Sequence, residues 1–250
     1  MVFGEDAAGY DAARPTYPDE LVDRLVELVG PDARVIDVGT GTAKSTRLLA
    51  QRGMTGVAVE PDPAMAGIAR EHLAPHPGWR VDVSDFEWWR PTDGDAPADL
   101  VSSSQAWHWV HPQVGLWRAH RLLRPGGWLA IFWNFSEPGD EPVERAIAAA
   151  YDEHFPGESL FPLIAHDQRS PFEPAVDGVA FEAVAGELFH WRQHYSTADL
   201  LALIATHSHH MLMPADQRER LFASVAAAVD AHGGAFDFPY VTRLWIGRRG

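Results

Sequence analysis

The segment from Asp37 to Thr46, DVGTGTAKST, is the feature that most constrains the fold. It joins a short hydrophobic run, ARVIDVG, to a segment with helical spacing, KSTRLLAQRG, and a second hydrophobic run, TGVAVEP, follows. Short apolar runs without alternation are typical of strands buried on both faces of a parallel sheet. The order strand, glycine loop, helix, strand predicts a βαβ unit whose loop faces a ligand.

A nucleotide P-loop is the first interpretation of this segment. Its pattern needs a glycine, four residues and then Gly-Lys-Ser/Thr, because the backbone amides must wrap one phosphate while the lysine reaches the next. Lys44 and Ser45 fit, but the two required glycines fall on Val38 and Ala43. The spacing therefore disfavours a P-loop.

A dinucleotide fingerprint, Gly-x-Gly-x-x-Gly, is the second interpretation. Gly39 and Gly41 fit, but Lys44 occupies the third position, where close packing of helix on strand wants no side chain. This weakens the dinucleotide interpretation and leaves it open. The third interpretation is a glycine turn behind an acid, Asp37, that holds an adenosine cofactor without a phosphate.

The remaining chain continues the alternation of strands and helices. We expect a helix at 18–29, and further helices at 63–72 and 112–123 alternate with strands at 79–84, 98–104 and 127–133. This pattern predicts an α/β fold, a Rossmann-like doubly wound sheet that is mostly parallel with an antiparallel last strand. After Asn134 the rhythm changes, which predicts a helical insertion after the fifth strand.

Composition bounds the size, the partners and the location of the protein. A chain of 250 residues with 46% hydrophobic residues suits a single domain, 1–250. A net charge of -15 with only 20 Lys and Arg argues against nucleic acid, whose phosphates bind basic residues. The N-terminus lacks a signal-peptide pattern and no apolar run reaches about 18 residues, so no membrane partner and a cytoplasmic location are expected. Without cysteine, thiolate chemistry is excluded.

Polar residues follow the expected strands at one edge of the sheet, where open α/β folds bind ligands. The first strand ends in Asp37, the second in Glu60, the third in Ser84-Asp85-Phe86 and the fourth in Ser104-Gln105-Ala106-Trp107-His108. Glu60 lies 19 residues after Gly41, a spacing that suits a carboxylate accepting both ribose hydroxyls.

The chain resembles class I S-adenosylmethionine-dependent methyltransferases. The resemblance rests on VIDVGTGTA, VAVEP, VSDFEWW, ADLVSSSQAWHWV and RLLRPGGWLAIFWN, and spans Tyr10 to Asn134. The opening YDAARPTYP together with QAWHW is similar to the small-molecule subgroup that includes trans-aconitate methyltransferase-like proteins. Ala43 stands where many members carry a third glycine, and the part after Asn134 matches only loosely.

The resemblance implies a cofactor, S-adenosyl-L-methionine, and a set of residues that bind it. Its glycine loop would let the backbone approach the cofactor, Glu60 would hold the ribose, and Asp85 with the Phe86 backbone would read the adenine. The N-terminal residues would form a flap, with the Arg14 fork suited to a carboxylate. The implied cofactor-binding residues are Tyr10, Arg14, Tyr17, Asp37, Gly39, Thr40, Gly41, Glu60, Asp85, Phe86, Ser104 and Gln105.

The segment after the fourth strand is the predicted substrate side. Trp107, His108 and Trp109 are predicted to bind the substrate, with His108 as catalytic residue and His111 as the second candidate. Imidazole titrates near working pH, so His108 can bind or deprotonate the acceptor. The alternative is a structural histidine buried between the two tryptophans and satisfied by a backbone partner.

The run HSHH, His207 to His210, resembles a metal site in composition only. Consecutive residues usually point in different directions and no paired carboxylate accompanies them, so no metal site is predicted.

The sequence therefore predicts methyl transfer from S-adenosylmethionine to an oxygen, nitrogen or activated carbon of a small molecule. A flap at 1–17 and a lid at 135–174 plus 196–215 are expected to cover the site. The alternatives are an NAD(P)-dependent oxidoreductase on the same sheet and a cofactor-binding module without chemistry.

Overall fold

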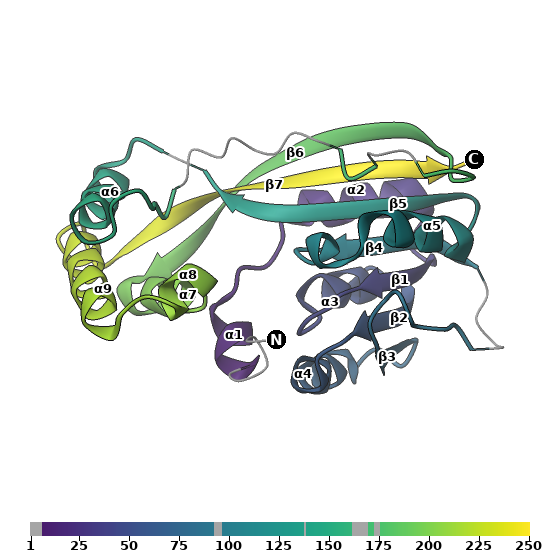
Figure 1. The fold of residues 1–250 in the computed structure, drawn as a ribbon, viewed down its shortest axis with the longest axis horizontal. Helices are drawn as coiled ribbons and strands as arrows, with labels where there is room; N and C mark the ends of the chain where they lie inside the picture. The colour runs from purple at the N-terminus through teal and green to yellow at the C-terminus, as the bar shows by residue number, and fades with distance from the viewer. Residues whose placement is uncertain (1–6, 93–96, 138, 162–169, 173–175) are drawn as a thin grey trace.

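The computed structural model describes residues 7–92, 97–137, 139–161, 170–172 and 176–250. Within them, seven strands form one sheet in the order β3-β2-β1-β4-β5-β7-β6 (Figure 1). The strands are β1 (Arg34–Val38), β2 (Thr55–Glu60), β3 (Trp79–Val83), β4 (Ala98–Ser104), β5 (Leu123–Ser136), β6 (Phe181–Ser196) and β7 (Ala235–Arg249). The helices are α1 (Ala7–Ala13), α2 (Asp19–Val29), α3 (Lys44–Gln51), α4 (Pro63–Leu73), α5 (Pro112–Leu122), α6 (Pro142–His154), α7 (Thr197–Ala205), α8 (Ser208–Met211) and α9 (Ala215–Asp230).

The direction of the strands confirms the predicted fold class. Strands β3, β2, β1, β4 and β5 pair in parallel, whereas β7 pairs antiparallel with both β5 and β6. The last strand of the chain is therefore the one that runs against the rest. It lies between β5 and β6, so the carboxyl ends of the five parallel strands remain together at one edge.

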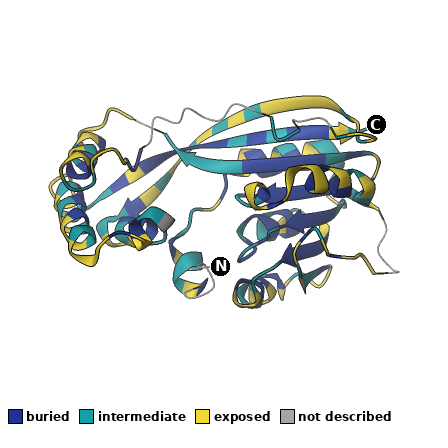
Figure 2. Cartoon of the chain, viewed as in Figure 1, coloured by how far each residue is buried: buried dark blue, intermediate teal, exposed yellow. Residues whose placement is uncertain are grey.

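Helices cover both faces of the sheet because successive strand residues point to opposite sides. On β1, Val35 packs with α2, α3 and α4, while its neighbour Ile36 packs on the opposite face with α5. Figure 2 shows these central strands buried between the helical layers. The apolar runs of the sequence are thus explained by burial on two sides.

Local sequence signals fix the helix that follows β2. Asp62 precedes α4, and its Oδ1 accepts hydrogen bonds from the backbone N–H groups of Ala64 (2.8 Å) and Met65 (3.2 Å). Pro63 stands in the first turn, where its missing N–H costs nothing. The capped start places the end of β2, with Glu60, directly beside the glycine loop.

The last two strands are longer than the strands that the sequence predicts at 181–191 and 239–247. Strand β6 continues to Ser196 and β7 begins at Ala235, so the hairpin-like pair extends beyond the sheet (Figure 1). Their far ends carry α6, α7, α8 and α9, and we call these elements together the helical lobe. The sequence missed the extension because the far ends alternate between lobe-facing and exposed residues, which weakens an apolar signal.

The helical lobe has a hydrophobic core of its own. Ile147, Leu200, Ile204, Leu221 and Val225 are fully buried there. The expected lid, 135–174 plus 196–215, supplies α6, α7 and α8. Helix α9 joins them; the sequence predicts a helix at 214–231 but does not place it in the lid. Residues 1–6, 138, 162–169 and 173–174 of the expected flap and lid lie outside the described residues. Among the described helices, none has the length and apolarity needed to cross a membrane.

Candidate functional site

The glycine loop follows β1 and has left-handed backbone at three positions. Gly39, Gly41 and Ala43 have φ values of 66°, 59° and 66°. A Cβ added to Gly39 would lie 2.4 Å from the Cβ of Ala106, whereas one added to Gly41 would meet only the Met65 Cε, at 3.7 Å. The absence of a side chain at Gly39 therefore leaves room for Ala106. At Gly41, by contrast, the backbone of the loop is left uncovered.

Asp37 lies beneath this loop and is completely buried. Its Oδ1 accepts a hydrogen bond from the Ser102 hydroxyl (2.6 Å) and its Oδ2 one from the Thr46 hydroxyl (2.5 Å). The Thr40 hydroxyl contacts that of Thr46 and is also buried. Burial raises the pKa of Asp37, against the lowering effect of these hydroxyls. The buried side chains of Asp37 and Thr40 thus stabilise the glycine loop.

Glu60, at the end of β2, connects the loop to the neighbouring strand. Its Oε2 accepts the Gly41 N–H (2.8 Å) and its Oε1 the Asp62 N–H (2.9 Å). Burial raises the pKa of Glu60, and the two N–H groups act in the opposite direction. A carboxylate has about four lone-pair sites, so Glu60 keeps acceptor capacity for a ligand.

The end of β3 places one acid in solvent and one ring in the core. Asp85 is exposed, and its carbonyl accepts the N–H groups of Trp88 (3.1 Å) and Trp89 (2.9 Å). Phe86 is buried, and the Arg118 guanidinium lies over its ring, 5.4 Å from the ring centroid. The side chain of Asp85 and the backbone of Phe86 are the parts that remain for a ligand.

The end of β4 is tied to α3 and to β5. The Ser104 and Ser45 hydroxyls share a hydrogen bond of 2.7 Å, and both residues are buried. Gln105 has a φ of 56°, which is uncommon for a residue other than glycine, and its Nε2 donates to the Asn134 carbonyl (3.2 Å). Such backbone strain concentrates at functional sites.

The N-terminal segment reaches the same edge of the sheet. Helix α1 lies between the helical lobe and α4 (Figure 1). Arg14 stacks on Tyr10, with 5.0 Å to the ring centroid, and donates from Nη2 to the Thr206 carbonyl (3.0 Å). Tyr17 is buried edge-on against Phe132, and burial raises its pKa.

Lys44, the residue that suggested a P-loop, points to this segment. Its Nζ lies 3.7 Å from Asp11 Oδ1, and His72 Nε2 lies 3.4 Å from Asp11 Oδ2. Burial lowers the pKa of Lys44, and the Asp11 charge raises it. Lys44 therefore fastens α1 to the start of α3, a role that the sequence did not predict.

The Trp-His-Trp segment forms a single 3₁₀ turn after β4, and its three side chains have different surroundings. Trp107 is buried against Gly115 and Phe86, so the structure places this predicted substrate residue in the core. His108 and Trp109 are exposed, with ring centroids 4.9 Å apart, and His108 is thus not buried between two tryptophans.

The histidine candidates of this segment differ in their contacts. The Trp133 Nε1–H donates to His108 Nδ1 at 3.5 Å, the upper limit for a hydrogen bond. Partial burial lowers the pKa of His108. A neutral imidazole that accepts at Nδ1 carries its proton on Nε2, so this contact favours His108 as a donor. His111 is exposed at the start of α5, and its backbone N–H donates to Glu87.

Asn134 was not singled out from the sequence, yet it links three parts of the site. Its Nδ2 donates to the Thr16 carbonyl (2.8 Å), and its Oδ1 accepts from the Thr242 hydroxyl (2.5 Å). Thr242 in turn accepts from Trp191 Nε1 (2.9 Å). Its position directly after the predicted strand at 127–133 was the available signal, although in the structure Asn134 lies within β5.

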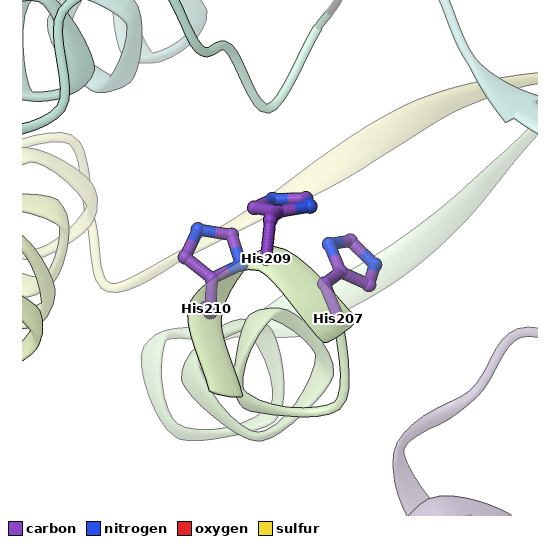
Figure 3. Close-up of side chains that lie close together, drawn as sticks. All are labelled: His207, His209 and His210. Atoms are coloured by element: carbon purple, nitrogen blue, oxygen red, sulfur yellow. The ribbon is translucent and has the colours of Figure 1, made fainter. Parts of the chain in front are cut away.

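The histidines of HSHH converge, contrary to the sequence-based expectation. The ligand atoms of His207, His209 and His210 all lie within 4.8 Å of one another. His207 precedes α8 and the other two lie within it, so the tight turn brings the three rings to one side (Figure 3). The three side chains do not diverge, because residues 207–210 form a tight helical turn.

The fold and the strand-end residues together define a class: α/β enzymes that bind an adenosine cofactor at the carboxyl edge of the sheet. The family model described as a methyltransferase domain matches residues 10–154. The uncharacterized methyltransferase Rv3342 of Mycobacterium tuberculosis is 31% identical, covering 97% of this chain and 93% of the relative. The chain belongs to the methyltransferase family and is a class I S-adenosylmethionine-dependent methyltransferase.

Two further comparisons bear on the substrate and on the fold. A trans-aconitate 2-methyltransferase of Variovorax paradoxus is 39% identical over 142 residues, which is 53% of this chain and 52% of that protein. A solved structure from Anaeromyxobacter dehalogenans, assigned as a type II methyltransferase, superposes with a TM-score of 0.65 at 21% identity, covering 94% of this chain and 97% of that one. The predicted fold and reaction class are confirmed, and the oxidoreductase alternative is not favoured.

Proposed function

We propose that this enzyme transfers a methyl group from S-adenosyl-L-methionine to a small-molecule acceptor. The observation that carries the proposal is the uncovered backbone at Gly41 beside the carboxylate of Glu60. A second observation supports the fit of the cofactor, because Arg14 Nε is buried without a hydrogen-bond partner among the described residues. A ligand carboxylate would satisfy such a donor.

The proposal assigns different tasks to the residues around the loop. Gly41 and Glu60 would contact the nucleoside, with Glu60 accepting from the ribose hydroxyls, and Asp85 with the Phe86 backbone would face the adenine. Asp37, Gly39, Thr40 and Ser104 would act through the shape of the loop, because their side chains or backbone are already engaged within it. Tyr10, Arg14, Tyr17 and Gln105 would close the amino-acid end.

The cofactor supplies an already activated methyl group, so the protein contributes mainly position and exclusion of water. Helix α1 and the helical lobe are the elements that would exclude water, since Arg14 connects them through Thr206. Exclusion of water is therefore the role that we propose for the flap at 1–17 and for the lid.

On the acceptor side we propose His108 and Trp109, with His111 as the second candidate. His108 would bind the acceptor through Nε2–H, in keeping with its contact to Trp133. Trp107 would support this surface from below, since it is packed in the core. The related trans-aconitate enzyme makes polycarboxylates the first acceptors to try.

The net charge of -15 supports free small molecules rather than nucleic acid as substrates. A cytoplasmic location stays a prediction of the sequence.

Two measurements test the proposal. Titration calorimetry should detect S-adenosylhomocysteine binding and no NAD binding. Transfer of labelled methyl from S-adenosylmethionine should then be assayed against a panel of small carboxylates, phenols and amines. Binding of NAD in preference to S-adenosylhomocysteine would overturn the proposal.

A further inference from the structure

His207, just before α8, and His209 and His210, within α8, gather three imidazoles on one side of that helix (Figure 3). The ring centroids of His209 and His210 are 4.1 Å apart, and His207 lies 5.5 Å and 5.7 Å from them. No step of the proposed methyl transfer uses this cluster.

His210 gives an independent sign that the cluster binds a ligand. It is completely buried, and its Nε2 shares a hydrogen bond of 3.0 Å with the Tyr151 hydroxyl. Its Nδ1 is buried without a hydrogen bond of good geometry among the described residues, although the backbone of Ile204 lies close enough to raise the pKa of the ring. A buried nitrogen without a hydrogen-bond partner is unfavourable, and a bound cation would remove that cost.

Imidazole is the commonest metal ligand among protein side chains. Neutral imidazole is the ligating form and suits Zn²⁺, Cu²⁺, Fe²⁺ and Ni²⁺.

Two charges lie near the cluster and act in opposite directions. Arg14 lowers the pKa of His207 and His209, whereas Glu158 raises that of His209. The charge of Arg14 opposes a bound cation, and the charge of Glu158 favours one.

We propose that His207, His209 and His210 bind one divalent transition-metal ion, of which Zn²⁺ is the fitting example, with a coordination position left for an oxygen ligand. Tetrahedral Zn²⁺ with Zn–N of about 2.0–2.1 Å needs nitrogens roughly 3.3 Å apart. The ligand atoms of the three histidines now lie within 4.8 Å of one another. Small side-chain rotations of His207 and His209, which are partly exposed, would bring these atoms to the required separation. Three histidines and one open position form the ligand pattern of reactive rather than purely structural zinc sites.

The test uses untagged full-length protein freed of metal by a chelator, with Zn²⁺ and Co²⁺ as the only probes. We expect one equivalent of either ion by calorimetry and a tetrahedral Co²⁺ absorption spectrum. His209→Ala and His207→Ala should each weaken binding by more than about 100-fold, since even outer-shell partners contribute about 10–100-fold. His232→Ala is the matched control, because this exposed histidine lies just after α9 and its side chain bonds the Ala228 carbonyl.

X-ray absorption on the Zn²⁺-loaded wild type gives a readout that does not depend on any variant folding. It should report about three imidazole nitrogens at roughly 2.0–2.1 Å. One imidazole or none, or equal affinity in wild type and His209→Ala, would overturn the proposal. Neither measurement uses the cofactor or a substrate, so failure of the metal site is distinct from failure of the methyl transfer.

Discussion

Gly39 and Ala106 approach so closely that a methyl group on Gly39 would lie 2.4 Å from the Ala106 Cβ. We expect Gly39→Ala to lower the free energy of unfolding by about 1–3 kcal/mol, because it adds a clash to a left-handed backbone position. Urea unfolding measures this change. Ala106→Gly in the same chain should restore part of the stability, leaving only the cost of the left-handed conformation. No restoration would mean that the two residues do not meet.

Glu60→Gln should weaken S-adenosylhomocysteine binding by about 1–3 kcal/mol, because one charged acceptor is lost. The side chain keeps its shape, so the loop contact to Gly41 changes least. Calorimetry measures the affinity, and Glu71→Gln, an exposed change of the same kind on α4, is the control. Equal affinities for the two variants would remove Glu60 from the cofactor site.

Asp37→Asn should change the dependence of stability on pH. Burial raises the pKa of Asp37 in the folded protein, so its contribution is fully present below the unfolded pKa of about 3.9 and is lost as pH rises through the folded value. Between about pH 4 and about pH 8, wild type should therefore lose stability relative to Asp37→Asn. Urea unfolding at both ends of this range gives the difference. A constant difference would contradict the raised pKa.

His108→Asn should raise KM for the acceptor while kcat stays within about tenfold, because we propose that His108 donates a hydrogen bond and takes no proton. Steady-state kinetics with the acceptor found in the panel measures both constants, and His111→Asn serves as the comparison. A general base would instead show a loss of kcat of roughly 10²-fold or more. That outcome would refute the donor assignment.

Helix α1 has seven residues and is too short to be stable alone. It is held by Asp11 and by Arg14, so its amides should exchange with solvent faster than those of β1 and slow when S-adenosylhomocysteine binds. Hydrogen exchange measures both, with α2 as internal control. Equal exchange of α1 with and without S-adenosylhomocysteine would rule out a flap.

The parallel half of the fold was predictable because each element carries a local signal. Asp62 and Pro63 begin α4, and the apolar runs ending in Asp37 and Glu60 mark strands buried on both sides. Topology alone then brings those strand ends together. The predicted residues at this edge could be found without knowing any distance.

Other features depend on contacts between distant segments and left no local signal. The need for glycine at position 39 comes from Ala106, and Trp107 is buried because Gly115 of α5 leaves room for it. The helical lobe forms from segments on both sides of β6, and the convergence of the three histidines depends on a turn. Sequence spacing does not report such relations.

Strands β6 and β7 extend from the sheet into the helical lobe, and this limits how the lobe can move. From Ala185 to Ser196, β6 pairs with β7 in one continuous register that runs from the sheet into the lobe, and the register shift between Glu182 and Ala185 lies at the end away from the lobe. The two strands therefore provide no hinge at the base of the lobe. Bending it would strain the whole ladder, whereas displacing α1 breaks only a few side-chain contacts. A ligand would therefore enter and leave past α1, and the lobe would serve as the fixed wall against which that helix closes.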